Sequence, residues 1–122
     1  MIMMNDFKKE SDDLRSKTLL AMQRVSESGY YLLGPELELF ERNWAETCNV
    51  RDAIGVANGM DAIEIALRSL DVGPGDEVIT TSMTAFATVL AIYRSGAIPV
   101  LADIAPETGL ICIDSVRRCL SK

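Results

Sequence analysis

The chain has 122 residues, a formal net charge of −6 and no histidine, and 48% of its residues are apolar. That composition supplies enough apolar material for the core of one globular domain, and the excess of acidic residues argues against binding to nucleic acid phosphates. The absence of histidine excludes a Ser-His or Cys-His hydrolase built within this chain.

Two further features of the sequence bear on the cellular compartment in which the protein is expected to lie. No apolar run approaches the roughly 20 residues that span a bilayer, and Met1–Met4 is followed at once by Asn5-Asp6 rather than by an apolar signal core. We therefore expect a cytoplasmic protein with no membrane partner. The cysteines are odd in number, widely scattered and contain no Cys-x-x-Cys pair, so we expect buried, reduced thiols rather than a disulfide framework or a metal site; they are Cys48, Cys112 and Cys119.

The first 50 residues predict two amphipathic helices. The first spans about residues 12–27 and ends near Gly29, because apolar or semi-apolar positions recur there at helical spacing: Leu14, Thr18, Ala21, Met22 and Val25. The second begins at Pro35, a residue that suits the first position of a helix. Its apolar stripe consists of Leu37, Phe40, Trp44 and Cys48, and its acidic residues near the start are Glu36, Glu38 and Glu41.

After Asp52 the pattern changes to strands that alternate with helices. Short apolar runs predict strands at 53–57, 77–81 and 98–102. Helices are expected after Asn58-Gly59, over about 84–94, and from 113 to 120. Pro99 indicates that the third strand lies at an edge of the sheet.

Two consecutive strand–helix–strand units favour right-handed crossovers and a mainly parallel sheet with flanking helices, and so an α/β fold. Ligands of such sheets bind beyond the carboxyl ends of the strands. Here those ends are residues 57–61, 81–85 and 102–104.

One of these ends, Asn58-Gly59-Met60-Asp61, lies where a strand is expected to turn into a helix. The first free N–H groups of a helix, with the positive end of the helix dipole behind them, suit a phosphate, and Gly59 lets the backbone approach an anion closely. Taken alone, these residues fit an ordinary turn at least as well. Asp61 fits a first-turn or capping carboxylate whose side chain faces away from any anion. No Walker loop and no Gly-x-Gly-x-x-Gly motif is present.

Phe86 lies at the start of the helix that follows the second strand. Its ring would be suited to stack on a flat heterocycle bound at the same edge of the sheet, and packing in the core is the alternative.

Six short motifs in a fixed order resemble the DegT/DnrJ/EryC1/StrS family over nearly all of the chain after about residue 28. They are Gly29-Tyr30-Tyr31-Leu32-Leu33-Gly34-Pro35-Glu36, Phe40-Glu41, Val56-Ala57-Asn58-Gly59-Met60-Asp61-Ala62, Gly73-Pro74-Gly75-Asp76-Glu77-Val78, Thr84-Ala85-Phe86-Ala87-Thr88 and Gly96-Ala97-Ile98-Pro99-Val100. Each motif is weak alone, and their order and spacing make the resemblance specific.

The resemblance implies the fold of type I, aspartate-aminotransferase-like enzymes that depend on pyridoxal 5'-phosphate (PLP). It implies a homodimer that moves an amino group from glutamate to a keto group on a nucleotide-linked sugar. By position, Gly59, Met60 and Asp61 match the turn that holds the cofactor phosphate, and Phe86 lies by the segment that stacks on the pyridine ring. Two departures stand out: Met60 replaces a frequent Ser or Thr, and the stacking aromatic commonly occupies the place of Ala85.

The resemblance also implies that this chain is the N-terminal part of such an enzyme. We expect one incomplete domain, with a helical segment over 1–50 and the start of the large PLP-binding domain over 51–122. The Schiff-base lysine and the aspartate that binds the pyridine nitrogen are expected beyond these residues, and no family lysine motif contains any of the four lysines: Lys8, Lys9, Lys17 and Lys122. No catalytic residue is therefore assigned, and the chain alone is predicted to be inactive. The alternative is a non-catalytic binding or assembly module derived from the same fold.

Overall fold

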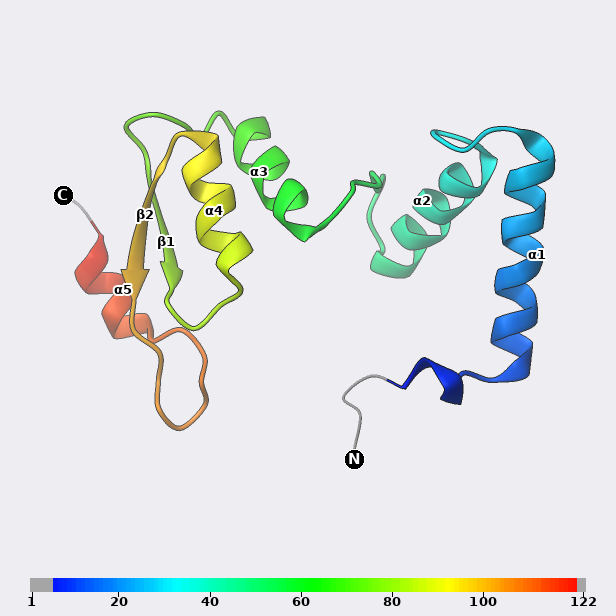
Figure 1. Cartoon of the computed structure of the whole chain (residues 1–122). Coiled ribbons are helices and arrows are strands. Elements are labelled where there is room, and N and C mark those ends of the chain that lie inside the picture. The colour runs from blue at the N-terminus through cyan, green and yellow to red at the C-terminus, as the bar shows by residue number, and fades with distance from the viewer. Residues whose placement is uncertain (1–5, 121–122) are drawn as a thin grey trace. The chain divides into compact units, whose positions relative to one another are not determined.

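The structure is a computed structural model that describes residues 6–120, so the expectation drawn from Met1–Met4 lies outside the described residues. The chain divides into two units, Met1–Gly55 and Val56–Lys122, and each is described here by itself. Among the described residues, the regular elements of the first unit are all helices, and the second unit combines helices with a sheet (Figure 1). Within residues 6–120, no helix has the length and apolar character that crossing a membrane requires.

The first unit confirms both predicted helices. A short 3-10 helix, η1 (Phe7–Lys9), precedes α1 (Asp12–Ser28), and α2 spans Pro35–Cys48. The Ser11 hydroxyl caps α1 by accepting a hydrogen bond from the Leu14 N–H at 3.2 Å. Gly29 ends α1 in the left-handed conformation, with φ of 71°. On the predicted stripe of α2, the Phe40 and Trp44 rings stack with their centroids 6.0 Å apart.

The second unit contains a parallel two-stranded sheet. Its elements are α3 (Gly59–Ser69), β1 (Glu77–Thr81), α4 (Phe86–Ser95), β2 (Ile98–Ala102) and α5 (Ile113–Cys119). β1 and β2 pair in parallel from Glu77↔Ile98 to Thr81↔Ala102, with α4 as the connection between them. α3 packs against α4, and α5 packs against β2 (Figure 1). The predicted α/β class and the parallel pairing are confirmed.

The strand predicted at 53–57 does not form, so the described residues contain one strand–helix–strand unit rather than two. A strand requires a neighbour that accepts and donates its backbone hydrogen bonds. In this segment the Gly55 N–H instead donates to the Glu41 carboxylate at 2.6 Å. The side chain of Ile54 is left 82% exposed. The run has the apolar composition of a strand, but no strand pairs with it among the described residues.

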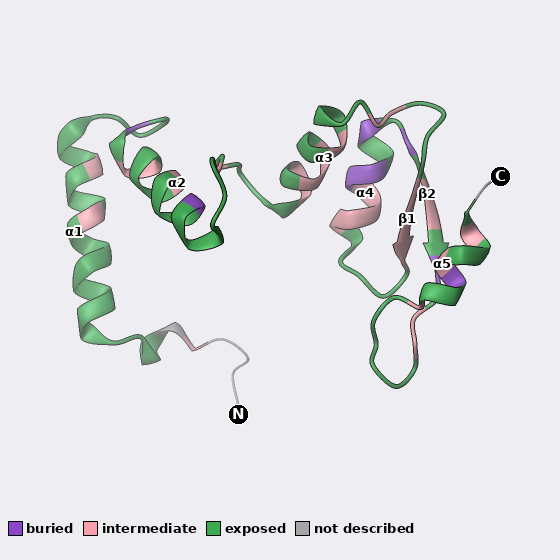
Figure 2. Cartoon of the chain, turned by 180° about the vertical axis from the view of Figure 1, so that it is seen from behind, coloured by how far each residue is buried: buried purple, intermediate pink, exposed green. Residues whose placement is uncertain are grey.

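The buried core is small and consists of short side chains (Figure 2). Its apolar members are Ala45 in the first unit, and Ala91, Ile92, Ala97 and Ala102 in the second. Many large apolar side chains are instead exposed, including Leu32 and Leu33 at 85% each.

The three cysteines are free, as expected, but the prediction that they are buried was wrong. Cys48 is exposed, and Cys112 and Cys119 are half-buried. Cys48 lies at the last position of α2, on the predicted apolar stripe. That stripe is half-exposed at Phe40 and Trp44, and an apolar stripe buries its residues only where another element covers it.

Candidate functional site

The first turn of α3 is closed by the Asn58 side chain. Asn58 is extended at the N-cap, and its side-chain oxygen accepts a hydrogen bond from the Asp61 N–H at 3.0 Å. Its side-chain NH2 group donates to the Asp61 carboxylate at 2.9 Å. The Ala62 N–H donates to the Asn58 carbonyl at 3.1 Å. Asn58 therefore occupies the amide of Asp61 and holds its carboxylate at the same time.

This cap leaves two backbone donors at the start of α3. Within residues 6–120, the N–H groups of Gly59 and Met60 donate to no other group, as expected for the first positions of a helix. A Cβ added at Gly59 would meet no heavy atom within 4 Å, so the space beside this turn is open. Two free amides at the positive end of a helix, next to open space, fit a phosphate group. The Asp61 carboxylate accepts a hydrogen bond from the Asn58 side chain. A first-turn carboxylate beside an anion site needs such a partner, because its negative charge would otherwise repel the anion.

Phe86 is the first residue of α4, and its side chain is 75% exposed. It therefore does not pack in the core, which was the alternative to a stacking role. The preceding residue, Ala85, is the extended N-cap of α4. Exposed aromatic surface at the start of a helix is compatible with a ligand contact.

α3 and α4 both begin on the side of the sheet toward which β1 and β2 run (Figure 1). The structure thus brings the Gly59–Asp61 turn and Phe86 to one edge of the second unit, at the carboxyl ends of the parallel strands. This is the edge at which open α/β sheets bind ligands.

A hollow of about 350 Å³ lies beside α3, lined by Val56, Ala57, Asp61, Glu64, Ile65 and Arg94. The lining combines apolar side chains with two carboxylates and one guanidinium.

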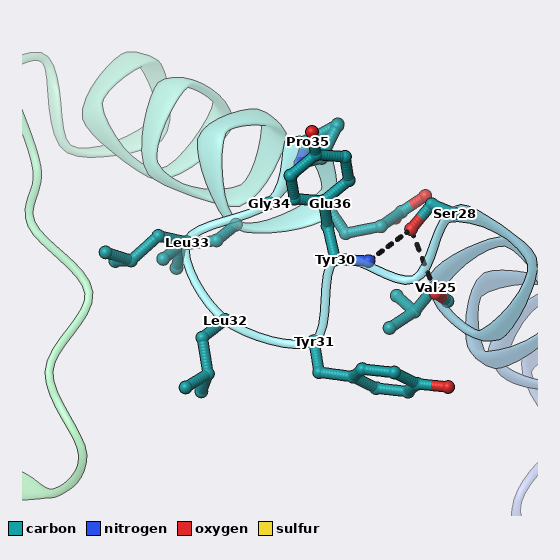
Figure 3. A pocket seen from close by; sticks show the side chains of 10 residues that line it. Val25, Ser28, Tyr30, Tyr31, Leu32, Leu33, Gly34, Pro35 and Glu36 are labelled. Carbon is teal, nitrogen blue, oxygen red and sulfur yellow. Dashed lines mark hydrogen bonds between the residues drawn. The ribbon is translucent and has the colours of Figure 1, made fainter.

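A second hollow belongs to the first unit and contains Tyr30 and Tyr31 (Figure 3). It has a volume of about 450 Å³ and lies between the end of α1 and the start of α2. The Tyr30 N–H donates to the Ser28 hydroxyl at 3.1 Å, which donates in turn to the Val25 carbonyl at 2.9 Å. The side chains of Tyr30 and Tyr31 are 67% and 71% exposed, so neither is a core residue.

The lysines of the described residues all lie in the first unit. Lys8, Lys9 and Lys17 are exposed, and Lys17 pairs with Asp13 at 2.7 Å. Lys122 lies outside the described residues. The second unit, where the candidate phosphate turn lies, has no lysine between 56 and 120. Over residues 6–120, no group of acidic, cysteine or histidine side chains is arranged to hold a metal ion.

A charged cluster that was not predicted from the sequence joins α3 to α4. Glu64, whose side chain is 12% exposed, accepts a hydrogen bond from Arg68 at 3.0 Å and forms an ion pair with Arg94 at 2.8 Å. The Arg68 guanidinium also donates to the Arg94 carbonyl at 2.6 Å. The i, i+4 spacing of Glu64 and Arg68 was visible in the sequence. The contribution of Arg94 was not visible in the sequence, because it depends on the packing of α3 against α4.

The comparison with known proteins decides the family. Residues 12–122 match the model of the DegT/DnrJ/EryC1/StrS aminotransferase family. The chain belongs to this family. It is 52% identical over 95 residues to the dTDP-3-amino-3,4,6-trideoxy-alpha-D-glucose transaminase of Streptomyces venezuelae, covering 78% of this chain and 25% of that protein.

Solved structures of the DegT/DnrJ/EryC1/StrS family agree with the fold. The S. venezuelae enzyme DesV superposes with a TM-score of 0.89 and 43% identity, over 95% of this chain and 31% of that one. NtdA from Bacillus subtilis, solved with bound cofactor PMP, superposes with a TM-score of 0.85 and 33% identity, over 91% of this chain and 26% of that one. The chain thus spans about a quarter to a third of these relatives. The predicted N-terminal portion of a PLP-dependent aminotransferase fold is confirmed.

Proposed function

We propose that this chain is the N-terminal part of a PLP-dependent aminotransferase that transfers an amino group from glutamate to a keto group of a nucleotide-linked sugar. The observation that carries the proposal is the 52% identity to a protein named as a dTDP-amino-sugar transaminase, over most of the chain. A second relative, 47% identical over 97 residues, is named as a transaminase of another dTDP-amino sugar. These names favour the aminotransferase over a non-catalytic binding or assembly module.

The residues of the second unit fit the phosphate end of PLP or of PMP, its amino form. In the proposed role, the free N–H groups of Gly59 and Met60 donate to the cofactor phosphate, and the α3 dipole adds favourable potential. The Asp61 N–H already donates to the Asn58 side chain. Asp61 is therefore proposed to help shape the turn through this cap, and not to donate its N–H to the phosphate.

Phe86 is proposed to contact the face of the pyridine ring, since its exposed side chain begins α4 at the same edge of the sheet. When bound, the cofactor supplies an electron-accepting ring that carries the amino group between the two substrates. The lysine that anchors it and the aspartate that binds its ring nitrogen are proposed to lie outside these 122 residues. The residues described here would therefore hold and orient the cofactor and would not transfer its protons.

We further propose that residues 51–122 begin the large cofactor-binding domain, preceded by the helical segment 1–50. The working enzyme is proposed to be a cytoplasmic homodimer that supplies amino sugars for polysaccharide biosynthesis. Its partners are then the nucleotide-linked keto sugar and glutamate.

The test is a pair of measurements on the longest product of the gene that contains this chain. Addition of PLP is expected to give a difference spectrum typical of a bound, lysine-linked cofactor. Glutamate with a nucleotide-linked keto sugar is expected to yield the amino sugar. The 122-residue chain alone is expected to give neither, and steady glutamate-dependent formation of amino sugar by that chain would refute the proposed division of roles. A gene product that lacks any lysine-linked PLP spectrum would refute the enzyme itself.

A further inference from the structure

The side chains of Glu64, Arg68 and Arg94 form a charged clamp between two helices whose first residues are both assigned to the cofactor. We propose that this clamp, and Glu64 above all, positions the Gly59–Met60 phosphate turn relative to Phe86. Glu64 is thus a positioning residue that acts through α3 and does not touch the cofactor. The inference rests on the proposed function, because it assumes that the turn binds the cofactor phosphate.

The clamp makes three short contacts around one carboxylate. Each oxygen of Glu64 has its own arginine: Oε1 with Arg68 at 3.0 Å and Oε2 with Arg94 at 2.8 Å. The Arg68 guanidinium reaches across to the Arg94 carbonyl at 2.6 Å. Glu64 is 12% exposed, whereas the side chains of Arg68 and Arg94 are 56% and 49% exposed. A largely buried carboxylate that binds two cations is held more firmly than a surface ion pair.

Apart from the clamp, α3 packs on α4 without burying any residue fully. The segment before it, 53–57, pairs with no strand among the described residues. α3 lies along α4, but no side chain of α3 is fully buried, and apolar contacts alone set the position of one helix along another only loosely. The clamp adds an ion pair and a hydrogen bond between the two helices, and a hydrogen bond depends on direction and length.

A slide along the helix axis is the motion that would matter for the site. One residue of an α-helix corresponds to about 1.5 Å of rise, so a shift by one residue would break the two contacts of the clamp that join α3 to Arg94 of α4. The same shift would move the amides of Gly59 and Met60 relative to Phe86. Because Glu64 lies five positions after Gly59 on the same helix, the clamp and the phosphate turn move as one body.

The experiment compares two ligands on the full-length aminotransferase that contains this chain. PLP and pyridoxal share the ring and the aldehyde, and only PLP carries the phosphate. Their dissociation constants are measured by absorbance titration for the wild type, for Glu64→Ala, and for a matched control, Glu107→Ala. Glu107 is an exposed glutamate in the loop between β2 and α5 of the same unit.

For Glu64→Ala we expect binding of PLP to weaken by about tenfold or more, with pyridoxal affinity changed by less than about twofold. Glu107→Ala is expected to leave both affinities unchanged. The proposal is overturned if Glu64→Ala binds PLP as tightly as the wild type does. It is also overturned if the affinities for PLP and pyridoxal fall equally, because such a loss is not specific for the phosphate. If Glu64→Ala is insoluble, Arg94→Lys is measured instead, and the same phosphate-specific loss is expected or the proposal fails.

The proposed function fails in a different way. If the wild-type enzyme binds PLP no more tightly than pyridoxal, the proposal that the Gly59–Met60 turn binds the phosphate is refuted. If the wild-type enzyme prefers PLP and the Glu64→Ala variant keeps the full preference, only the proposed role of the clamp is refuted.

Discussion

Arg24 of α1 forms a two-point ion pair with Glu36 of α2, and so joins the two helices across the turn that contains Tyr30 and Tyr31. The Arg24 Nε donates to Glu36 Oε1 at 2.6 Å, and the Arg24 Nη2 donates to Oε2 at 3.1 Å. The hydrogen bond from Arg24 lowers the pKa of Glu36 below its ordinary value; desolvation opposes this shift, and the charge of Arg24 adds to it. The same hydrogen bond, with the charge of Glu36, raises the pKa of Arg24.

This pair predicts the sign of a pH effect. Because the folded pKa of Glu36 is lowered, its contribution to stability is present above the pKa of the unfolded chain and is lost as the pH falls through the folded value. The Arg24 side chain is exposed and that of Glu36 is only partly buried, so the effect on global stability should be small and should shrink as salt is added. We expect a carboxyl NMR titration of Glu36 to show a midpoint below the value of about 4.3 typical of free glutamate.

Arg24→Gln is the control for this titration. It removes the charge and the two-point contact, so the midpoint of Glu36 should rise toward the ordinary value. An unchanged midpoint in Arg24→Gln would show that the ion pair does not form in solution.

Gly96 and Gly75 allow backbone strain to be separated from close packing. Both have a positive φ, of 92° and 99°. A Cβ at Gly96 would lie 3.0 Å from the Pro74 Cδ, whereas a Cβ at Gly75 would meet nothing within 4 Å. Gly75→Ala should therefore cost about 1 kcal/mol for the left-handed conformation alone. Gly96→Ala should cost about 1 kcal/mol more, because Pro74 must also move.

The measurement is amide hydrogen exchange of β1 and β2 in the chain with each substitution. Exchange should be fastest in Gly96→Ala, intermediate in Gly75→Ala and slowest in the wild type. Equal exchange in the two variants would mean that Pro74 yields without cost.

The exposed apolar side chains predict how the isolated chain behaves. Within residues 6–120, the buried apolar residues are four alanines and Ile92, while Leu32, Leu33 and Ile54 are each more than four-fifths exposed. Surfaces of this kind bind hydrophobic dyes and associate. We expect the purified 122-residue chain to enhance the fluorescence of anilinonaphthalene sulfonate and to elute as oligomers at high concentration. A monomer that leaves the dye dark would show that these faces are covered in solution.

The helices and the paired strands followed from local signals, and the failures came from contacts that are distant in sequence. Ser11, Gly29, Pro35 and Gly96 mark helix ends through chemistry that acts within a few residues. Segment 53–57 has the apolar composition of a strand, but strand formation also needs a partner, and composition does not supply one. The burial of Cys48 failed for a related reason, because a helical stripe predicts which side chains share a face and not whether another element covers that face.

The candidate site, too, was predictable only in part: local residue types could be read from the sequence, and contacts between distant residues could not. Gly59 at the start of a helix was recognisable from residue types alone, and the structure adds that Asn58 occupies the Asp61 amide. That the Asn58 side chain makes this bond, rather than water or a ligand, depends on its rotamer. Likewise Glu64 and Arg94 are thirty residues apart in the numbering and meet only because α3 packs on α4.

Asn58 offers the last prediction, since it both caps α3 and restrains Asp61. Asn58→Ala removes the acceptor for the Asp61 N–H and the donor to the Asp61 carboxylate. Loss of an N-cap costs about 1 kcal/mol, so the amides of Asp61 and Ala62 should exchange faster with solvent while those of β1 and β2 change little. Asn58→Ser keeps an oxygen that caps the helix and should restore most of the protection. If Asn58→Ser and Asn58→Ala exchange alike at Asp61, the cap is not the interaction that orders this turn.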